Sequence, residues 1–279
     1  MYSMLFRAVS ETLLTIAADP RRLGADIGFL AVLHSWNQQM LHHPHLHCLI
    51  PAGGVSLDRS RWVPCRQRFF LPVKVLGSLF RGKFLAFLAA AYRKRKLRLF
   101  GSLAQLQNPS EFDRFLARLR TLHWVVYAKP PFGGPEHLIK YLARYTHRVA
   151  ISNGRLLQMQ DEKVTFRWRD SADGNKQKHM TLDAVEFIRR FLLHVLPSGF
   201  VKIRHFGFLA NCKRHESLAL CRSLLPQTSI PATTVLTESH QRAVERKCPF
   251  CKTGTLHVIE RIPPGALIPA SLPTYENTS

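Results

Sequence analysis

The stretch LHSWNQQMLHHPHLHCLIPAGG, residues 33–54, decides how the rest of this sequence is interpreted. Residues 45–50 have the composition of a short strand, which Pro51 and the following glycines end in a turn. Alternate side chains of a strand share a face and lie ~6.6 Å apart along it. His45 and His47 therefore point the same way, while Leu46 points into the core. Two such imidazoles can converge on one metal ion, and the alternative is a chance pair in a histidine-rich surface.

A second pattern lies about a hundred residues further on, in the segment of residues 136–147, which is predicted to be a helix. Tyr141 and Tyr145 are spaced i, i+4, so they share one face of this helix. A phenol is a usable nucleophile toward phosphorus when a metal or cation offsets its charge. Arg144 and Arg148 lie beside that face and can hold phosphates. The alternative is an amphipathic helix that packs two aromatic rings in the core.

A metal site built on the histidine pair needs a third ligand. His137 lies four residues before Tyr141, on the same helix face, and Glu136 precedes it. The candidates closer to the pair in sequence are His34, Gln38, Gln39, His42 and His43. The residues alone leave this choice open.

Outward from these motifs, strand-like and helical segments alternate without regular βαβ spacing, which predicts an α+β fold. The expected strands are residues 27–33, 45–50, 124–128 and 164–169. The expected helices are residues 3–18, 73–98, 109–119 (with Ser110 as N-cap), 136–147 and 181–195. We expect one domain over residues 1–225, with a helical, basic insertion at about 73–119 and a Pro-rich tail at 226–279. In this tail, Cys248 and Cys251 have the spacing of half a zinc knuckle, with unpaired reduced cysteines as the alternative.

The charge of the chain indicates its partner. Lys and Arg number 40 against 18 Asp and Glu, so the 279 residues carry a formal net charge of +22. Such an excess repels itself unless a polyanion neutralises it, and nucleic acid is the default polyanion. A basic run that we expect to contact the DNA backbone comprises Arg93, Lys94, Arg95 and Lys96. The longest apolar run, Phe84 to Tyr92, is too short to span a bilayer, so no membrane is expected. Sparse cysteines favour a reduced cytoplasmic protein, and with DNA as the expected partner we expect it to be nucleoid-associated.

Together the two motifs resemble the HUH endonucleases, and more closely the IS91-like two-tyrosine transposases. The stretches that carry the resemblance are residues 33–56, 127–156 and 187–211. The family implies an antiparallel sheet with flanking helices and a rolling-circle-type transposition of single-stranded DNA. It implies His45 and His47 as ligands of Mg²⁺ or Mn²⁺. The third ligand does not carry over, and we infer Glu136 or His137 from the tyrosine helix, or His34. It implies Tyr141 and Tyr145 as nucleophiles that form a 5′-phosphotyrosine.

The resemblance also has a departure and leaves alternatives. Family members usually carry a cysteine-rich, zinc-binding region ahead of the point where this sequence begins. The chain is therefore expected to be a truncated copy, and a non-catalytic DNA-binding remnant is one alternative. A rolling-circle replication initiator is another. Residues 77–83 nearly match a phosphate-binding loop, but Phe84 stands where a hydroxyl is needed. Strand separation is thus expected from a host helicase or the replication machinery.

Overall fold

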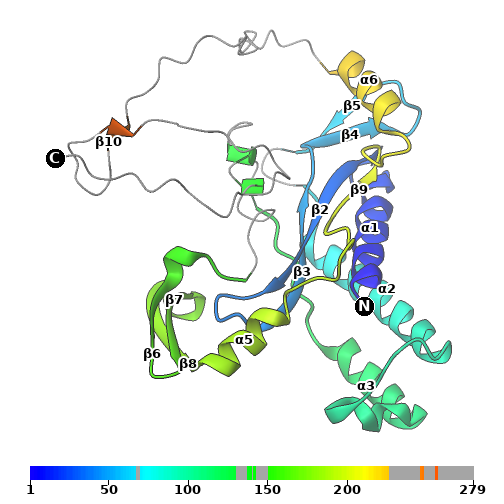
Figure 1. Ribbon diagram of the computed structural model, residues 1–279. Helices are drawn as coiled ribbons and strands as arrows, with labels where there is room; N and C mark the ends of the chain where they lie inside the picture. Colours follow the sequence, from blue (N-terminus) through cyan, green and yellow to red (C-terminus); the bar gives the residue numbers. More distant parts are fainter. Residues whose placement is uncertain are drawn as a thin grey trace. The chain divides into compact units, whose positions relative to one another are not determined.

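The computed structural model describes residues 1–66, 70–129, 137–139, 141–142, 150–225, 246–247 and 255–256. The chain divides into two compact units, Met1–Gln227 and Thr228–Ser279. The first unit is mixed α+β and every paired strand in it is antiparallel, which confirms the predicted fold class (Figure 1). In the second unit the described strands are β10 (Arg246–Lys247) and β11 (Thr255–Leu256), which pair with each other.

The central sheet has the strand order β3-β2-β9, with bounds His42–Leu49, Gly28–Trp36 and Ile203–Gly207. Helix α1 (Tyr2–Ala18) packs on one face of this sheet, as expected for residues 3–18. Phe29, Ala31 and Leu33 of β2 join its apolar side chains in the main core, and Leu46 and Cys48 of β3 pack against them. The opposite face of the same strands is left for the alternating histidines, as the period of two requires.

A small sheet, in the order β1-β4-β5, lies next along the chain, with bounds Ala25–Asp26, Gly53–Ser56 and Trp62–Pro64. Helix α2 (Val73–Arg93) follows and contacts α1. The expected helix over 73–98 was too long, because α2 ends at Arg93. Arg95 adopts a positive φ of 52°, and the Lys96 N–H bonds to the Ala91 carbonyl. This Schellman-type C-terminal motif ends the helix, so the rest of the basic run lies beyond it.

Helix α3 (Pro109–Thr121) confirms the expected helix, with a different cap. The Asn108 side chain, and not that of Ser110, accepts the free N–H at the N-terminus. The strand expected at 124–128 is wrong: these residues have no regular structure, and Trp124 and Val126 pack against α2. A Cβ added at Gly77 of α2 would lie 2.7 Å from the Trp124 carbonyl oxygen, so only glycine admits this approach.

A third sheet, in the order β6-β7-β8, has the bounds Leu156–Gln160, Lys163–Asp170 and Lys176–Asp183. β7 confirms the expected strand, whereas the helix expected at 181–195 begins later, as α5 (Ala184–Leu192). Residues up to Asp183 pair with β7, so cross-strand hydrogen bonds replace a helical turn there. Helix α6 (Arg214–Leu224) ends the unit.

The turn between β2 and β3 packs into this third sheet. Met40 has a positive φ of 57° and is fully buried with Ala150 and Phe166. The buried His194, just after α5, donates from Nε2 to the Met40 carbonyl at 3.0 Å and accepts from the Ser35 hydroxyl at Nδ1, 3.2 Å away. The strands that carry the histidines are therefore anchored at their shared turn.

By length and composition alone, α2 is apolar enough to cross a membrane, the one such helix in the described part of the chain. The core helix of a globular domain passes the same test, and Leu76, Leu85 and Leu88 of α2 are buried in two apolar clusters. The absence of a membrane partner stays a prediction.

Candidate functional site

Three histidines converge on the face of the central sheet opposite α1. His34 of β2 lies directly across from His45 of β3, and His47 pairs with Val32. Facing residues of an antiparallel pair share a side of the sheet, so β2 and β3 present all three rings together. His34 Nδ1 lies 3.3 Å from His45 Nε2, which lies 3.1 Å from His47 Nε2. One ligand atom from each ring lies within 4.8 Å of the others, a geometry able to hold a metal ion.

Hydrogen bonds select the ring nitrogens that face the centre of this group. His45 Nδ1 lies 2.7 Å from the His43 carbonyl oxygen, which can only accept, so Nδ1 carries the proton. The Nε2 lone pair of His45 is thereby turned toward His34 and His47. This is the arrangement in which a metal-binding histidine donates its other N–H to a carbonyl.

All three imidazoles are held in the neutral form that binds metal. Burial, together with repulsion from the protonated His45, His47, Lys202 and His194, lowers the pKa of His34 to about 3. Burial, together with His45 and Lys129, lowers the pKa of His47 to about 4. Burial also lowers the pKa of His45. The rings therefore do not compete with a cation by binding protons near neutral pH.

The structure brings one predicted nucleophile to this group. The Tyr141 hydroxyl lies 2.8 Å from His47 Nδ1, on the side of the ring away from the other histidines. The ammonium of Lys129 lies 5.9 Å from the centre of the Tyr141 ring. Residues 137–139 and 141–142 are helical, as the sequence predicts for this segment. A phenol, a cation and a group of neutral imidazoles thus meet at one place.

The other predicted site residues divide into three sets. His137 is exposed and does not belong to the group of three histidines. The basic residues Arg93, Lys94, Arg95 and Lys96 are exposed at the end of α2. Predictions that lie outside the described residues concern Glu136, Arg144, Tyr145, Arg148, Cys248 and Cys251.

Sequence reasoning left His34 as one of several third ligands and missed the two lysines. The choice of His34 depends on the pairing register of β2 with β3, which no local pattern specifies. Lys129 belongs to no motif of the sequence, and Lys202 precedes β9, whose place beside β2 is a long-range pairing.

Comparison with known proteins identifies the family. A sequence profile of the family described as "Putative transposase", the Y2 transposases, matches residues 28–216. The "Putative transposase y4qJ" of Sinorhizobium fredii (strain NBRC 101917 / NGR234) is 53% identical over 269 residues, which are 93% of this chain and 67% of that protein.

A more distant relative is the "Transposase for insertion sequence element IS801" of Pseudomonas savastanoi pv. phaseolicola, 26% identical over 223 residues. That alignment covers 74% of this chain, and the chain spans 48% of that relative's length. No solved structure matches the chain. The family match covers more than half of the sequence, and the three histidines and Tyr141 all lie inside it. This chain therefore belongs to the Y2 transposase family.

Proposed function

We propose that this chain nicks and rejoins single-stranded DNA through a phosphotyrosine on Tyr141, with a divalent cation held by His34, His45 and His47. The observation that carries the proposal is the 2.8 Å contact between the Tyr141 hydroxyl and His47, a member of the three-histidine group. It supports a nucleophile beside a candidate metal site on one surface of the central sheet. The family match and the net charge of +22 support DNA as the substrate.

The donor set fits a cation. Three neutral nitrogens face one centre, and at least one of them is fixed in its tautomer by a carbonyl. A bound divalent cation would polarise the scissile phosphate and offset its developing charge. The family resemblance favours Mg²⁺ or Mn²⁺. Imidazole donors by themselves are more typical of transition metals, so between these two the site favours Mn²⁺.

The protein groups around Tyr141 favour its phenolate. With His47 Nε2 turned to the cation, Nδ1 carries the ring proton. Its N–H then donates a hydrogen bond to the Tyr141 oxygen. The Lys129 ammonium adds positive charge near the same ring. Both effects stabilise the ionised nucleophile relative to the neutral phenol, whose proton leaves to water.

The chemical step conserves the number of phosphate ester bonds. The Tyr141 oxygen forms a bond to phosphorus, the bond between phosphorus and the 3′ oxygen breaks, and that oxygen takes up a proton. The products are a 5′-phosphotyrosine and a free 3′-OH. A 3′-OH of the same or another strand then attacks the phosphotyrosine and releases the tyrosine, so no ATP is consumed. Tyr145 would supply the second cleavage, as the family resemblance implies.

The test is a covalent adduct assay. The full chain is incubated with labelled single-stranded oligonucleotides that carry candidate element ends, with Mn²⁺ or Mg²⁺, and resolved on a denaturing protein gel. We expect a labelled band at the size of the protein that is lost with EDTA, with His45→Ala/His47→Ala and with Tyr141→Phe.

The exposed Tyr127 and His123 provide matched controls, since Tyr127→Phe and His123→Ala remove the same groups outside the site. An adduct that persists in Tyr141→Phe and disappears in Tyr145→Phe would assign the first attack to the other tyrosine. DNA binding without an adduct on any matched end, in a folded chain that binds Mn²⁺, would contradict the proposed chemistry.

A further inference from the structure

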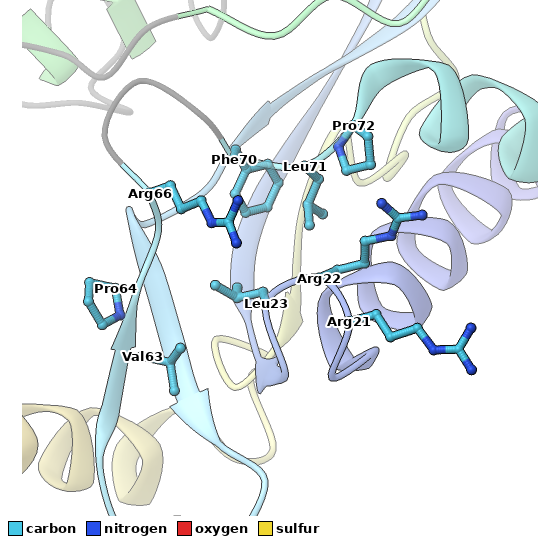
Figure 2. Close-up of a pocket in the computed structure, with 9 residues that line it drawn as sticks. All are labelled: Arg21, Arg22, Leu23, Val63, Pro64, Arg66, Phe70, Leu71 and Pro72. Carbon is cyan, nitrogen blue, oxygen red and sulfur yellow. The ribbon is translucent and has the colours of Figure 1, made fainter.

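A basic pocket lies outside the histidine site, where α1 ends and α2 begins. Its volume is about 290 Å³, which is at the lower end of small-ligand sites. Among the described residues, Arg21, Arg22 and Arg66 line it, and no acidic side chain does. In Figure 2 the side chains of Arg66 and Arg22 flank Phe70 and Leu71, whereas Arg21 extends outward.

The backbone holds these arginines in place. Arg22 follows the end of α1, and its N–H bonds to the Asp19 carbonyl at 2.8 Å. The Gly24 N–H bonds to the same carbonyl, with a φ of 66° at this glycine, so the arginine pair lies on a closed turn. Arg66 comes directly after Cys65, whose N–H bonds to the Ala52 carbonyl at 3.1 Å. Backbone hydrogen bonds therefore fix the positions from which the arginine side chains extend.

No acidic partner offsets their charge within the described residues. The side chains of Arg21, Arg22 and Arg66 are exposed and take part in no ion pair or side-chain hydrogen bond there. Helix α2 adds to the positive potential, because its N-cap, Pro72, lines the pocket. This end of the helix has no side-chain cap and no acidic residue in its first turn. A free helix N-terminus attracts anions, and arginine forks match phosphate oxygens.

The remaining lining suits the apolar part of a nucleotide. Leu23, Phe70 and Leu71 form an apolar wall next to the guanidinium groups. A sugar or base can lie against such a wall while its phosphate meets the arginines. The pocket therefore combines the two kinds of contact that a nucleoside phosphate makes.

We infer that this pocket binds one nucleotide of the DNA strand, away from the cleaved bond. The inference rests on the proposed function for the identity of the polymer. Arg22 precedes β2 in the chain, and His34 lies six steps after Gly28 along β2, a distance of ~20 Å. The nucleotide in the pocket thus lies several positions from the phosphate at the histidines, and it fixes where along the strand cleavage falls.

The test measures DNA binding in EDTA, so that neither metal nor cleavage contributes. A fluorescent oligothymidylate is titrated with the full chain and with Arg22→Gln/Arg66→Gln. The control, Arg118→Gln/Arg120→Gln, removes the same charge from exposed positions of α3. We expect about tenfold weaker binding for the pocket variant and about twofold for the control, with the salt slope lowered by ~1.4 in the pocket variant alone. Circular dichroism checks that both variants fold.

Further arms separate the sources of the phosphate. Free thymidine monophosphate and inorganic phosphate are added as competitors of the labelled oligothymidylate, and we expect both to displace it only weakly, because neither makes the contacts of a strand outside the pocket. If the free nucleotide displaces the long strand as well as unlabelled DNA does, the pocket is a mononucleotide site and the strand assignment is overturned. Equal weakening by the two double variants would overturn the inference as well, since net charge alone would then explain the loss.

Failure of this inference is distinguishable from failure of the proposed function. Adduct formation with unaltered binding in Arg22→Gln/Arg66→Gln would overturn the pocket and leave the chemistry. The absence of any adduct, together with the selective binding defect, would overturn the chemistry and leave the pocket.

Discussion

At the scale of single residues, His34 is the side chain that separates a metal site from a chance pair of histidines. Its Nδ1 completes the group formed with His45 and His47. We expect Mn²⁺ to raise the melting temperature of the wild-type chain. At a Mn²⁺ concentration a hundred times Kd, binding should add about 2.7 kcal/mol to the free energy of unfolding. His34→Ala should lose most of this shift, and His123→Ala should keep it. Differential scanning fluorimetry measures the shifts, and an equal Mn²⁺ effect in both variants would exclude His34 as a ligand.

The same histidines predict how stability depends on pH in the absence of metal. The folded-state pKa values of His34, about 3, and His47, about 4, lie below the ordinary histidine value of 6.5. Below pH 6.5 the unfolded chain therefore takes up protons that the folded chain does not, and the unfolding free energy falls as the pH drops toward 4. Urea unfolding in EDTA at pH 7.5 and pH 5 should show this loss.

Carboxylates contribute little to that comparison, because Asp and Glu stay ionised over most of this window. The double variant His34→Gln/His47→Gln should flatten the dependence. A wild-type chain whose stability is the same at the two pH values would show that these rings are not held neutral.

At the scale of elements, alanine substitution is expected to have opposite effects on stability at two glycines of α2. A Cβ at Gly82 meets nothing within 4 Å, whereas one at Gly77 meets the Trp124 carbonyl oxygen at 2.7 Å. Gly82→Ala should stabilise the chain by about 0.5–1 kcal/mol through helix propensity. Gly77→Ala should destabilise it, because the backbone of residues 122–126 must move away. Urea unfolding of the pair compares them, and stabilisation by both alanines would contradict the packing of this segment on α2.

A second prediction at this scale concerns the stability of the turn between β2 and β3. His194 bonds to the Met40 carbonyl and the Ser35 hydroxyl, and it is 2% exposed. His194→Ala leaves both groups without this partner, so we expect a loss of about 1–3 kcal/mol. His179→Ala, at an exposed position of β8, should change stability by less than about 0.5 kcal/mol. Chemical unfolding measures both, and similar values would show that His194 does not anchor the turn.

At the scale of the whole molecule, the net charge of +22 predicts strongly salt-dependent DNA binding. Each phosphate neutralised on a single strand contributes ~0.7 to the slope of log K against log salt. Three such contacts give about a 20-fold loss of affinity between 50 and 200 mM salt. Fluorescence anisotropy over this range tests it. A slope near zero would mean that the positive charges do not contact the strand.

The family of the chain was readable from local patterns. The His45-Leu-His47 alternation predicted a strand with two rings on one face, and the structure places them so, with Leu46 toward the core. The spacing of residues 3–18 predicted α1, because helix periodicity is a property of neighbouring residues. The errors arose where local signals compete, as at residues 124–128, whose strand-like composition has no partner strand among the described residues.

Only the tertiary structure decided which residues complete the site. His34 joins His45 through the antiparallel register of β2 and β3, and Tyr141 reaches His47 across 94 positions of the chain. The basic pocket unites the turn after α1 with the start of α2, two places that share no sequence pattern. The sequence by itself determined the elements and the chemical groups, because propensity and periodicity act between near neighbours. The pairing of distant segments is set by burial and register, which are properties of the folded chain as a whole.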